Sequence, residues 1–203
     1  MIKKIQKNRG MTYVELIVVL AIFGIMSTVV LYNYGEFQDR VDIKNMASDI
    51  ALKIVQAQKA SLNGQLPDRD ITYNPATSWK PSYGVYFNLS FDDKSFIYFS
   101  DLNQDGQLDS TTCSGSGECL DQVFITKGDR ISDISYTYLD GTVVAPAPTQ
   151  YSAITFKRPD STTHFYLDNS EITGLEYFQI TLESPKSKNA TITVYPSGRI
   201  QVN

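Results

Sequence analysis

The sequence predicts an α+β protein in which one long N-terminal helix packs on a β-rich C-terminal region. Apolar residues run almost without interruption over 16–31 and then recur at helical spacing as far as Ala57. After Pro67 the pattern changes to alternating residues rich in Tyr, Phe, Val, Ile and Thr, which is typical of strands. A length of 203 residues favours one globular region in addition to this helix.

The first part of the helix has the composition of a membrane span. Within 16–31 only Ser27 and Thr28 are polar, and residues 11–14 extend the apolar stretch. The stretch reaches about 20 residues, which is enough to cross a hydrocarbon core of about 30 Å. One carboxylate, Glu15, lies at its start, and an ionisable residue in a membrane segment is a functional hypothesis. The alternative for Glu15 is an interfacial residue without a partner.

The residues before the apolar stretch are basic and end in a glycine. By the positive-inside rule this end stays in the cytoplasm and the C-terminal region lies outside a membrane crossed once. A secretory signal is cut after its apolar core, whereas Gly10 precedes the core, so a cut there would keep the helix. The basic residues are Lys3, Lys4, Lys7 and Arg9.

The stretch from Gly10 to about Leu31 resembles the N-terminus of type IV pilins and type II secretion pseudopilins. The resemblance implies that a prepilin peptidase cleaves between Gly10 and Met11 and methylates the new amino group of Met11. It implies that Glu15 pairs with the N-terminal amine of a neighbouring subunit during assembly. The implied partners are other pilin or pseudopilin subunits, the peptidase, an inner-membrane assembly platform and membrane lipid.

The predicted organisation has four parts. A leader peptide covers 1–10, the transmembrane and assembly half of the helix covers 11–31, an amphipathic half covers 32–62, and the β-rich head covers 67–203. The amphipathic half is recognised by an apolar stripe at three- and four-residue steps. The stripe comprises Ile43, Met46, Ala47, Ile50, Ile54 and Ala57.

The head is predicted to start after a helix stop at Asn63–Gly64. Segments 85–89 and 95–99 predict one hairpin, and 190–195 and 199–202 predict another. The other predicted strands are 122–126, 134–139, 153–157, 164–167 and 177–182, and 141–150 is expected to be a loop.

The C-terminal half carries a second resemblance. Segments 154–159, 179–182 and 191–200 are similar to GspH/FimT-type minor pseudopilins. That resemblance implies two antiparallel sheets packed against the long helix, with a Gly-Arg-Ile hairpin at the end of the chain.

Segment 101–109 reads D-x-N-x-D-G-x-x-D and predicts a calcium loop. Oxygen ligands at positions 1, 3 and 5, a turn glycine at 6, a carbonyl at 7 and an acid at 9 suit calcium. The loop resembles those of EF-hand and dockerin-type proteins, but Thr112 replaces the acid at position 12, which Glu118 or Asp121 could supply. The alternative is an ordinary polar turn. The predicted ligands are Asp101, Asn103, Asp105, Gln107 and Asp109.

The two cysteines, Cys113 and Cys119, predict a disulfide, because a close pair in an exported chain is normally oxidised. Zinc would need more ligands, and the single histidine, His164, is far away in sequence. No nucleophile motif accompanies His164, so no enzymatic activity and no catalytic residue is expected.

Charge and motifs together indicate a function. The chain has 18 Lys and Arg against 22 Asp and Glu, and loss of the basic leader makes it more acidic, which argues against broad nucleic-acid binding. We expect a structural subunit of an extracytoplasmic type IV pilus-like or type II secretion filament, inserted first in the cytoplasmic membrane and then located in a periplasmic or extracellular filament. The alternative is a ligand-binding or adhesion module at a pilus tip or cell surface, including DNA uptake through Lys186, Lys188 and Arg199.

Overall fold

A computed structural model describes the chain except for residues 1–9, 68–80, 114–116, 148–149, 161 and 169. The predicted leader therefore lies, apart from Gly10, outside the described residues. The chain forms two compact units, Met1–Arg40 and Val41–Asn203. Helix α1, Tyr13–Asn63, contributes its first part to one unit and its last part to the other.

The last part of α1 packs in the core of the second unit through the predicted stripe. Ile43, Ala47, Ile50, Ile54 and Ala57 are almost completely buried there. The stripe forms because side chains three and four residues apart share one face of a helix.

The helix ends where the sequence predicts a stop. The N–H of Gly64 donates to the Ser61 carbonyl (3.0 Å), and the N–H of Gln65 donates to the Ala60 carbonyl (3.0 Å). Gly64 has φ of +59°, so this is a Schellman motif with glycine in the left-handed position.

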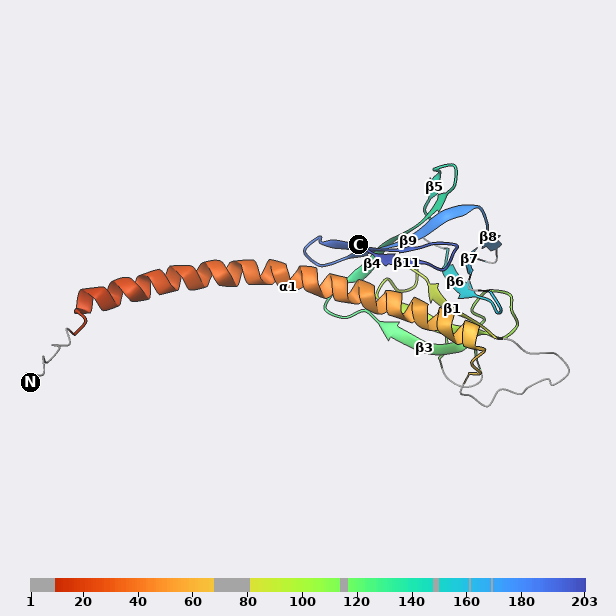
Figure 1. The fold of residues 1–203 in the computed structure, drawn as a ribbon, viewed down its shortest axis with the longest axis horizontal. Helices are drawn as coiled ribbons and strands as arrows, with labels where there is room; N and C mark the ends of the chain where they lie inside the picture. Colours follow the sequence, from red (N-terminus) through yellow and green to blue (C-terminus); the bar gives the residue numbers. More distant parts are fainter. Residues whose placement is uncertain (1–9, 68–80, 114–116, 148–149, 161, 169) are drawn as a thin grey trace, which may run out of the picture. The chain divides into compact units, whose positions relative to one another are not determined.

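The first sheet has six strands, and each hydrogen-bonded pair is antiparallel. Its order is β3-β2-β1-β6-β7-β8, and Figure 1 labels β1, β3, β6, β7 and β8 of this sheet. The strands are β1 Ser82–Phe87, β2 Ser95–Asp101, β3 Cys119–Phe124, β6 Ser152–Phe156, β7 Thr163–Leu167 and β8 Ser170–Ile172.

The second sheet has five strands, also paired antiparallel, in the order β11-β10-β9-β4-β5. Its strands are β4 Arg130–Tyr138, β5 Val143–Val144, β9 Leu175–Glu183, β10 Asn189–Val194 and β11 Ile200–Val202. The long helix and the two antiparallel sheets confirm the predicted α+β class.

Both predicted hairpins form, as β1 with β2 and as β10 with β11. The prediction of an uninterrupted loop over 141–150 is wrong, because β5 lies inside it and pairs with β4. Strand β8 was not predicted. Both short strands are largely exposed, so neither has the buried alternation that marks a strand in a sequence.

The two sheets and the helix share one core. Phe165 of β7 and Phe178 of β9 stack across the sheets with ring centroids 5.6 Å apart. Tyr136 of β4 meets Phe178 edge-on at 5.0 Å, and its hydroxyl donates to the Tyr166 carbonyl of β7 (3.1 Å). The sheets are thus joined by aromatic packing and by a buried hydrogen bond.

The six-stranded sheet is also covered on its other face. Strands β1, β2 and β6 are buried at every position, where a sheet with one wet face would show alternation. The β2–β3 loop (102–118) explains this, because it contributes Leu108 and Cys113 to a second apolar cluster. The buried members of that cluster are Tyr86, Ile97, Phe99, Cys119, Ala153 and Tyr166.

Candidate functional site

The first unit presents an apolar helix surface. Among the described residues, α1 is the one helix long and apolar enough to cross a membrane. Its apolar side chains are exposed around the whole circumference, from Val14 to Leu31. A helix that is apolar all round is stable when lipid or other apolar helices surround it. This part of α1 therefore fits a membrane anchor.

Glu15 helps to cap the N-terminus of this helix. Its Oε2 accepts hydrogen bonds from the backbone N–H (2.9 Å) and the hydroxyl (3.0 Å) of Thr12. The N–H of Glu15 in turn donates to Thr12 Oγ1 (3.3 Å). This reciprocal pair is a capping box, which satisfies backbone donors that the first helical turn leaves free. The capping role of Thr12 was not predicted, although the Thr-x-x-Glu spacing signals it.

The bond between Gly10 and Met11 lies ahead of the helix. Both residues are exposed, and the helix begins only at Tyr13. The predicted cleavage site is therefore not held in helical hydrogen bonds. Because Glu15 lies in the first turn, a cut there would place the new amine close in sequence to the capping carboxylate.

A second group of polar residues lies at the start of the β2–β3 loop. Asp101 ends β2 and is completely buried. Its Oδ2 accepts the N–H of Gly106 (2.9 Å), which draws the loop around the carboxylate. Its Oδ1 is buried and has no hydrogen-bond partner among the described residues.

Glu118 holds the other end of the loop. Its Oε1 accepts the N–H of Leu102 (2.8 Å) and its Oε2 accepts the N–H of Asp109 (3.0 Å), and the residue is only 4% exposed. Asp121, the other residue considered for the twelfth position, instead pairs with Lys53 Nζ at 2.9 Å. Of the two, Glu118 is the one inside the loop.

The remaining predicted calcium ligands lie in the same turn. The Asn103 amide donates to Asp105 Oδ2 (3.0 Å) and to Asp109 Oδ2 (3.2 Å). Gln107 donates its N–H to Asp105 Oδ1 (2.9 Å), and its side-chain Oε1 accepts the Tyr151 hydroxyl (2.8 Å). Within the described residues, no three His, Cys, Asp or Glu side chains are already gathered around a metal position.

Burial raises the pKa of Asp101 to about 6 and that of Glu118 to about 7. The backbone N–H groups that donate to each carboxylate oppose this rise, and the negative charges of Asp105 and Asp109 add to it. Lys157, whose Nζ donates to the Tyr166 hydroxyl (2.7 Å), favours the ionised form of Asp101. The loop thus holds two buried carboxyl groups among like charges.

The predicted disulfide between Cys113 and Cys119 is confirmed, with Cα atoms 4.7 Å apart. Cys119 is fully buried in the cluster beneath the β2–β3 loop and directly follows Glu118. The disulfide therefore ties the end of the loop to β3 next to the buried carboxylate.

Gly106 is required by this loop for two reasons. Its φ is +85°, and a Cβ there would overlap the Tyr166 ring. We expect Gly106→Ala to lower the free energy of unfolding by about 2–3 kcal/mol, measured by urea denaturation of the detergent-solubilised chain.

Gly141→Ala is the matched control for that substitution. Gly141 has φ of +83°, but nothing lies within 4 Å of the Cβ position. It should therefore show the backbone cost alone, about 1 kcal/mol. Equal losses for the two variants would contradict the packing of Tyr166 on Gly106.

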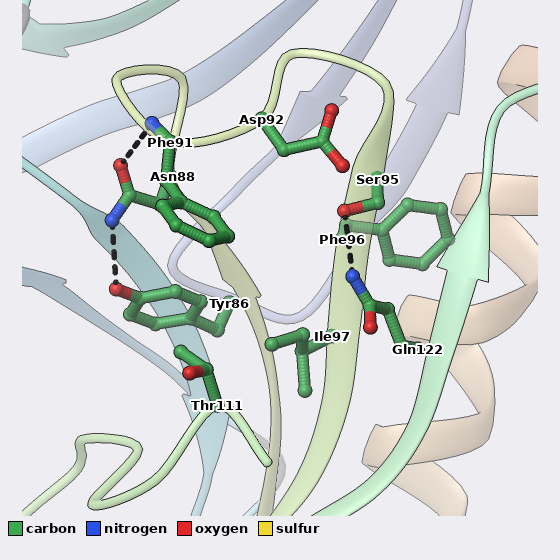
Figure 2. Close-up of a pocket in the computed structure, with 9 residues that line it drawn as sticks. All are labelled: Tyr86, Asn88, Phe91, Asp92, Ser95, Phe96, Ile97, Thr111 and Gln122. Atoms are coloured by element: carbon green, nitrogen blue, oxygen red, sulfur yellow. Dashed lines mark hydrogen bonds between the residues drawn. The ribbon is translucent and has the colours of Figure 1, made fainter. Parts of the chain in front are cut away.

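A pocket lies beside the loop, on the outer side of β1 and β2 (Figure 2). The Asn88 side chain bridges the Tyr86 hydroxyl (3.2 Å) and the N–H of Phe91 (3.1 Å), and Gln122 donates to Ser95 Oγ (3.1 Å). The volume of this pocket is about 200 Å³. This is below the range of about 300–1,000 Å³ that is usual for small-molecule sites.

His164 and Arg199 each contact a neighbouring side chain. His164 Nδ1 lies 2.6 Å from Glu171 Oε1, which fits a surface contact between β7 and β8. The Arg199 guanidinium lies 3.8 Å from the centroid of the Tyr195 ring. Neither arrangement includes a nucleophile.

Comparison with known proteins bears on the N-terminal segment first. The prokaryotic N-terminal methylation motif matches residues 5–31. A fimbrial protein of Pseudomonas aeruginosa is 29% identical over 125 residues, which covers 59% of this chain and 77% of that protein. A second fimbrial protein of the same organism is 28% identical over the same shares of both chains. No solved structure matches the chain significantly. The methylation motif, the exposed apolar helix and the similarity to fimbrial proteins support the predicted resemblance to type IV pilins.

Proposed function

We propose that the protein is a minor subunit of a type IV pilus-like or type II secretion filament, assembled through the first part of α1. The observation that carries the proposal is the apolar, exposed helix surface that begins at a helix-capping carboxylate, Glu15. Such a surface is stable first in lipid and then among the helices of neighbouring subunits.

In this proposal, the negative charge of Glu15 attracts the neighbouring subunit during assembly. The carboxylate already accepts hydrogen bonds from Thr12, and its remaining lone pairs can accept an ammonium group. A charge in lipid is strongly disfavoured unless an opposite charge is close. The methylated amine of Met11 in a neighbouring subunit is the proposed partner, supplied after prepilin peptidase cleavage.

The resemblance of the head to GspH/FimT-type minor pseudopilins supports the proposal of a minor subunit. The two antiparallel sheets of the head pack with the helix in one core, which is the arrangement implied by the resemblance to GspH/FimT-type pseudopilins. In this proposal the leader is cytoplasmic, the head is extracytoplasmic, and an inner-membrane platform inserts the subunit into the filament.

The N-terminus of the membrane-extracted protein tests this proposal. Intact-mass spectrometry should show a chain that begins at Met11 and carries one extra methyl group. The catalytically inactive peptidase background is the control, and there the chain should keep Met1. A mature N-terminus at Met1 in wild-type cells, or one downstream of Leu31, would refute the proposed assembly route.

A further inference from the structure

We propose that segment 101–109 and Glu118 together bind one calcium ion, with Asp101 and Glu118 as the two buried carboxylates that close the site. The observation that carries this inference is the Asp101 carboxylate. It is completely buried at the end of β2, and its Oδ1 has no hydrogen-bond partner among the described residues. A buried carboxylate oxygen without a donor is destabilising unless a cation or another donor reaches it.

The unpartnered oxygen belongs to the loop and not to the sheet. The other oxygen of the same carboxylate accepts the Gly106 N–H, so the group lies within the turn formed by 101–106. The first ligand of a calcium loop occupies the same position, and the glycine at the sixth position turns the chain over the ion. Asn103 and Asp105, the third and fifth residues, are exposed in the same turn and carry side-chain oxygens.

Glu118 replaces the acid that the sequence lacks at the twelfth position. Its carboxylate spans the loop, since it accepts N–H groups from Leu102 and from Asp109. Each carboxylate oxygen has a second lone pair that stays available to a cation. The disulfide between Cys113 and Cys119 constrains the backbone directly after Glu118, which holds this return ligand near the loop.

In this structure the Asn103 amide lies between the exposed carboxylates of Asp105 and Asp109. Its NH₂ group donates to Asp105 Oδ2 and to Asp109 Oδ2, which is a bridge that a cation can replace. Rotation of this amide would turn its oxygen toward the ion and release both carboxylates as ligands. Calcium suits this arrangement because it accepts six to eight oxygen ligands in flexible geometry. The proposed ligand set is Asp101, Asn103, Asp105, the Gln107 carbonyl, Asp109 and Glu118.

Calorimetric titration of the full chain in detergent micelles with calcium chloride tests the site. We expect one ion per chain with Kd of about 0.1–1 mM, the range of extracellular modules. Calcium at 10 mM, compared with EDTA, should raise Tm by about 5 °C. Asp101→Asn and Glu118→Gln should each weaken binding at least tenfold and remove most of the rise in Tm.

Two further variants keep the test decisive. Asp105→Asn changes an exposed side chain, so it should fold normally and still weaken binding at least tenfold. Asp92→Asn is the matched control, because Asp92 Oδ1 accepts the Lys94 N–H (2.9 Å) in a turn outside the loop, and it should bind as the wild type does. No binding by the wild type up to 10 mM calcium would overturn the inference. So would unchanged binding by both Asp101→Asn and Asp105→Asn.

Discussion

Replacing Glu15 by alanine should leave the protein in the membrane and remove it from filaments. Loss of the carboxylate lowers the free energy of inserting the helix into the membrane, by about 3 kcal/mol at most. A defect in filament assembly therefore cannot come from poorer insertion. In the proposed assembly, the variant loses the attraction between the Glu15 carboxylate and the amine of a neighbouring subunit. Immunoblots of sheared filaments should show at least a tenfold lower amount than in wild type, with an unchanged amount in the membrane fraction.

Two companion variants separate the charge of Glu15 from its capping role. Glu15→Gln can keep the capping box with Thr12, because glutamine also serves at this position, but it removes the charge. Thr12→Ala removes the capping hydroxyl, at a cost of about 1 kcal/mol, and keeps the charge. We expect Glu15→Gln to fail in assembly as Glu15→Ala does and Thr12→Ala to assemble. The reverse result would assign Glu15 to helix capping alone.

Replacing Phe178 by alanine should cause the largest loss of stability in the head. Phe178 is completely buried in β9 and contacts Tyr136 and Phe165, the aromatic residues that join the two sheets. Truncation leaves a cavity as well as lost apolar burial, so we expect the free energy of unfolding to fall by about 3–5 kcal/mol. Urea denaturation of the full chain in detergent, followed by near-ultraviolet circular dichroism, measures this loss.

Phe91→Ala is the matched control for the aromatic core. Phe91 is 82% exposed in the turn between β1 and β2, so its truncation should change stability by less than about 0.5 kcal/mol. A loss below about 1 kcal/mol for Phe178→Ala would contradict the packing of the two sheets on a shared core.

The local elements were predictable from the sequence because their signals are local. The stripe from Ile43 to Ala57 follows from helical spacing, and Gly64 marks the helix end through its lack of a Cβ. The hairpins β1–β2 and β10–β11 join segments that are close in sequence. The capping role of Thr12 is equally local, because the Thr-x-x-Glu spacing alone signals it.

The rest depends on contacts between distant segments. The pairing of β1 with β6 and of β4 with β9 joins strands that no short sequence window relates. For the same reason the sequence left the return ligand open between Glu118 and Asp121. Lys53 on the helix, which pairs with Asp121, resolves the choice only once the head is folded.

We expect this chain to be built into a filament through its N-terminal helix. Immunogold electron microscopy of wild-type cells, with antibodies raised against the head, tests it most directly. We expect gold particles on filaments that emerge from the cytoplasmic membrane, and none on such filaments when the prepilin peptidase is inactive. Labelling confined to the membrane in wild-type cells that carry the same filaments would contradict the claim.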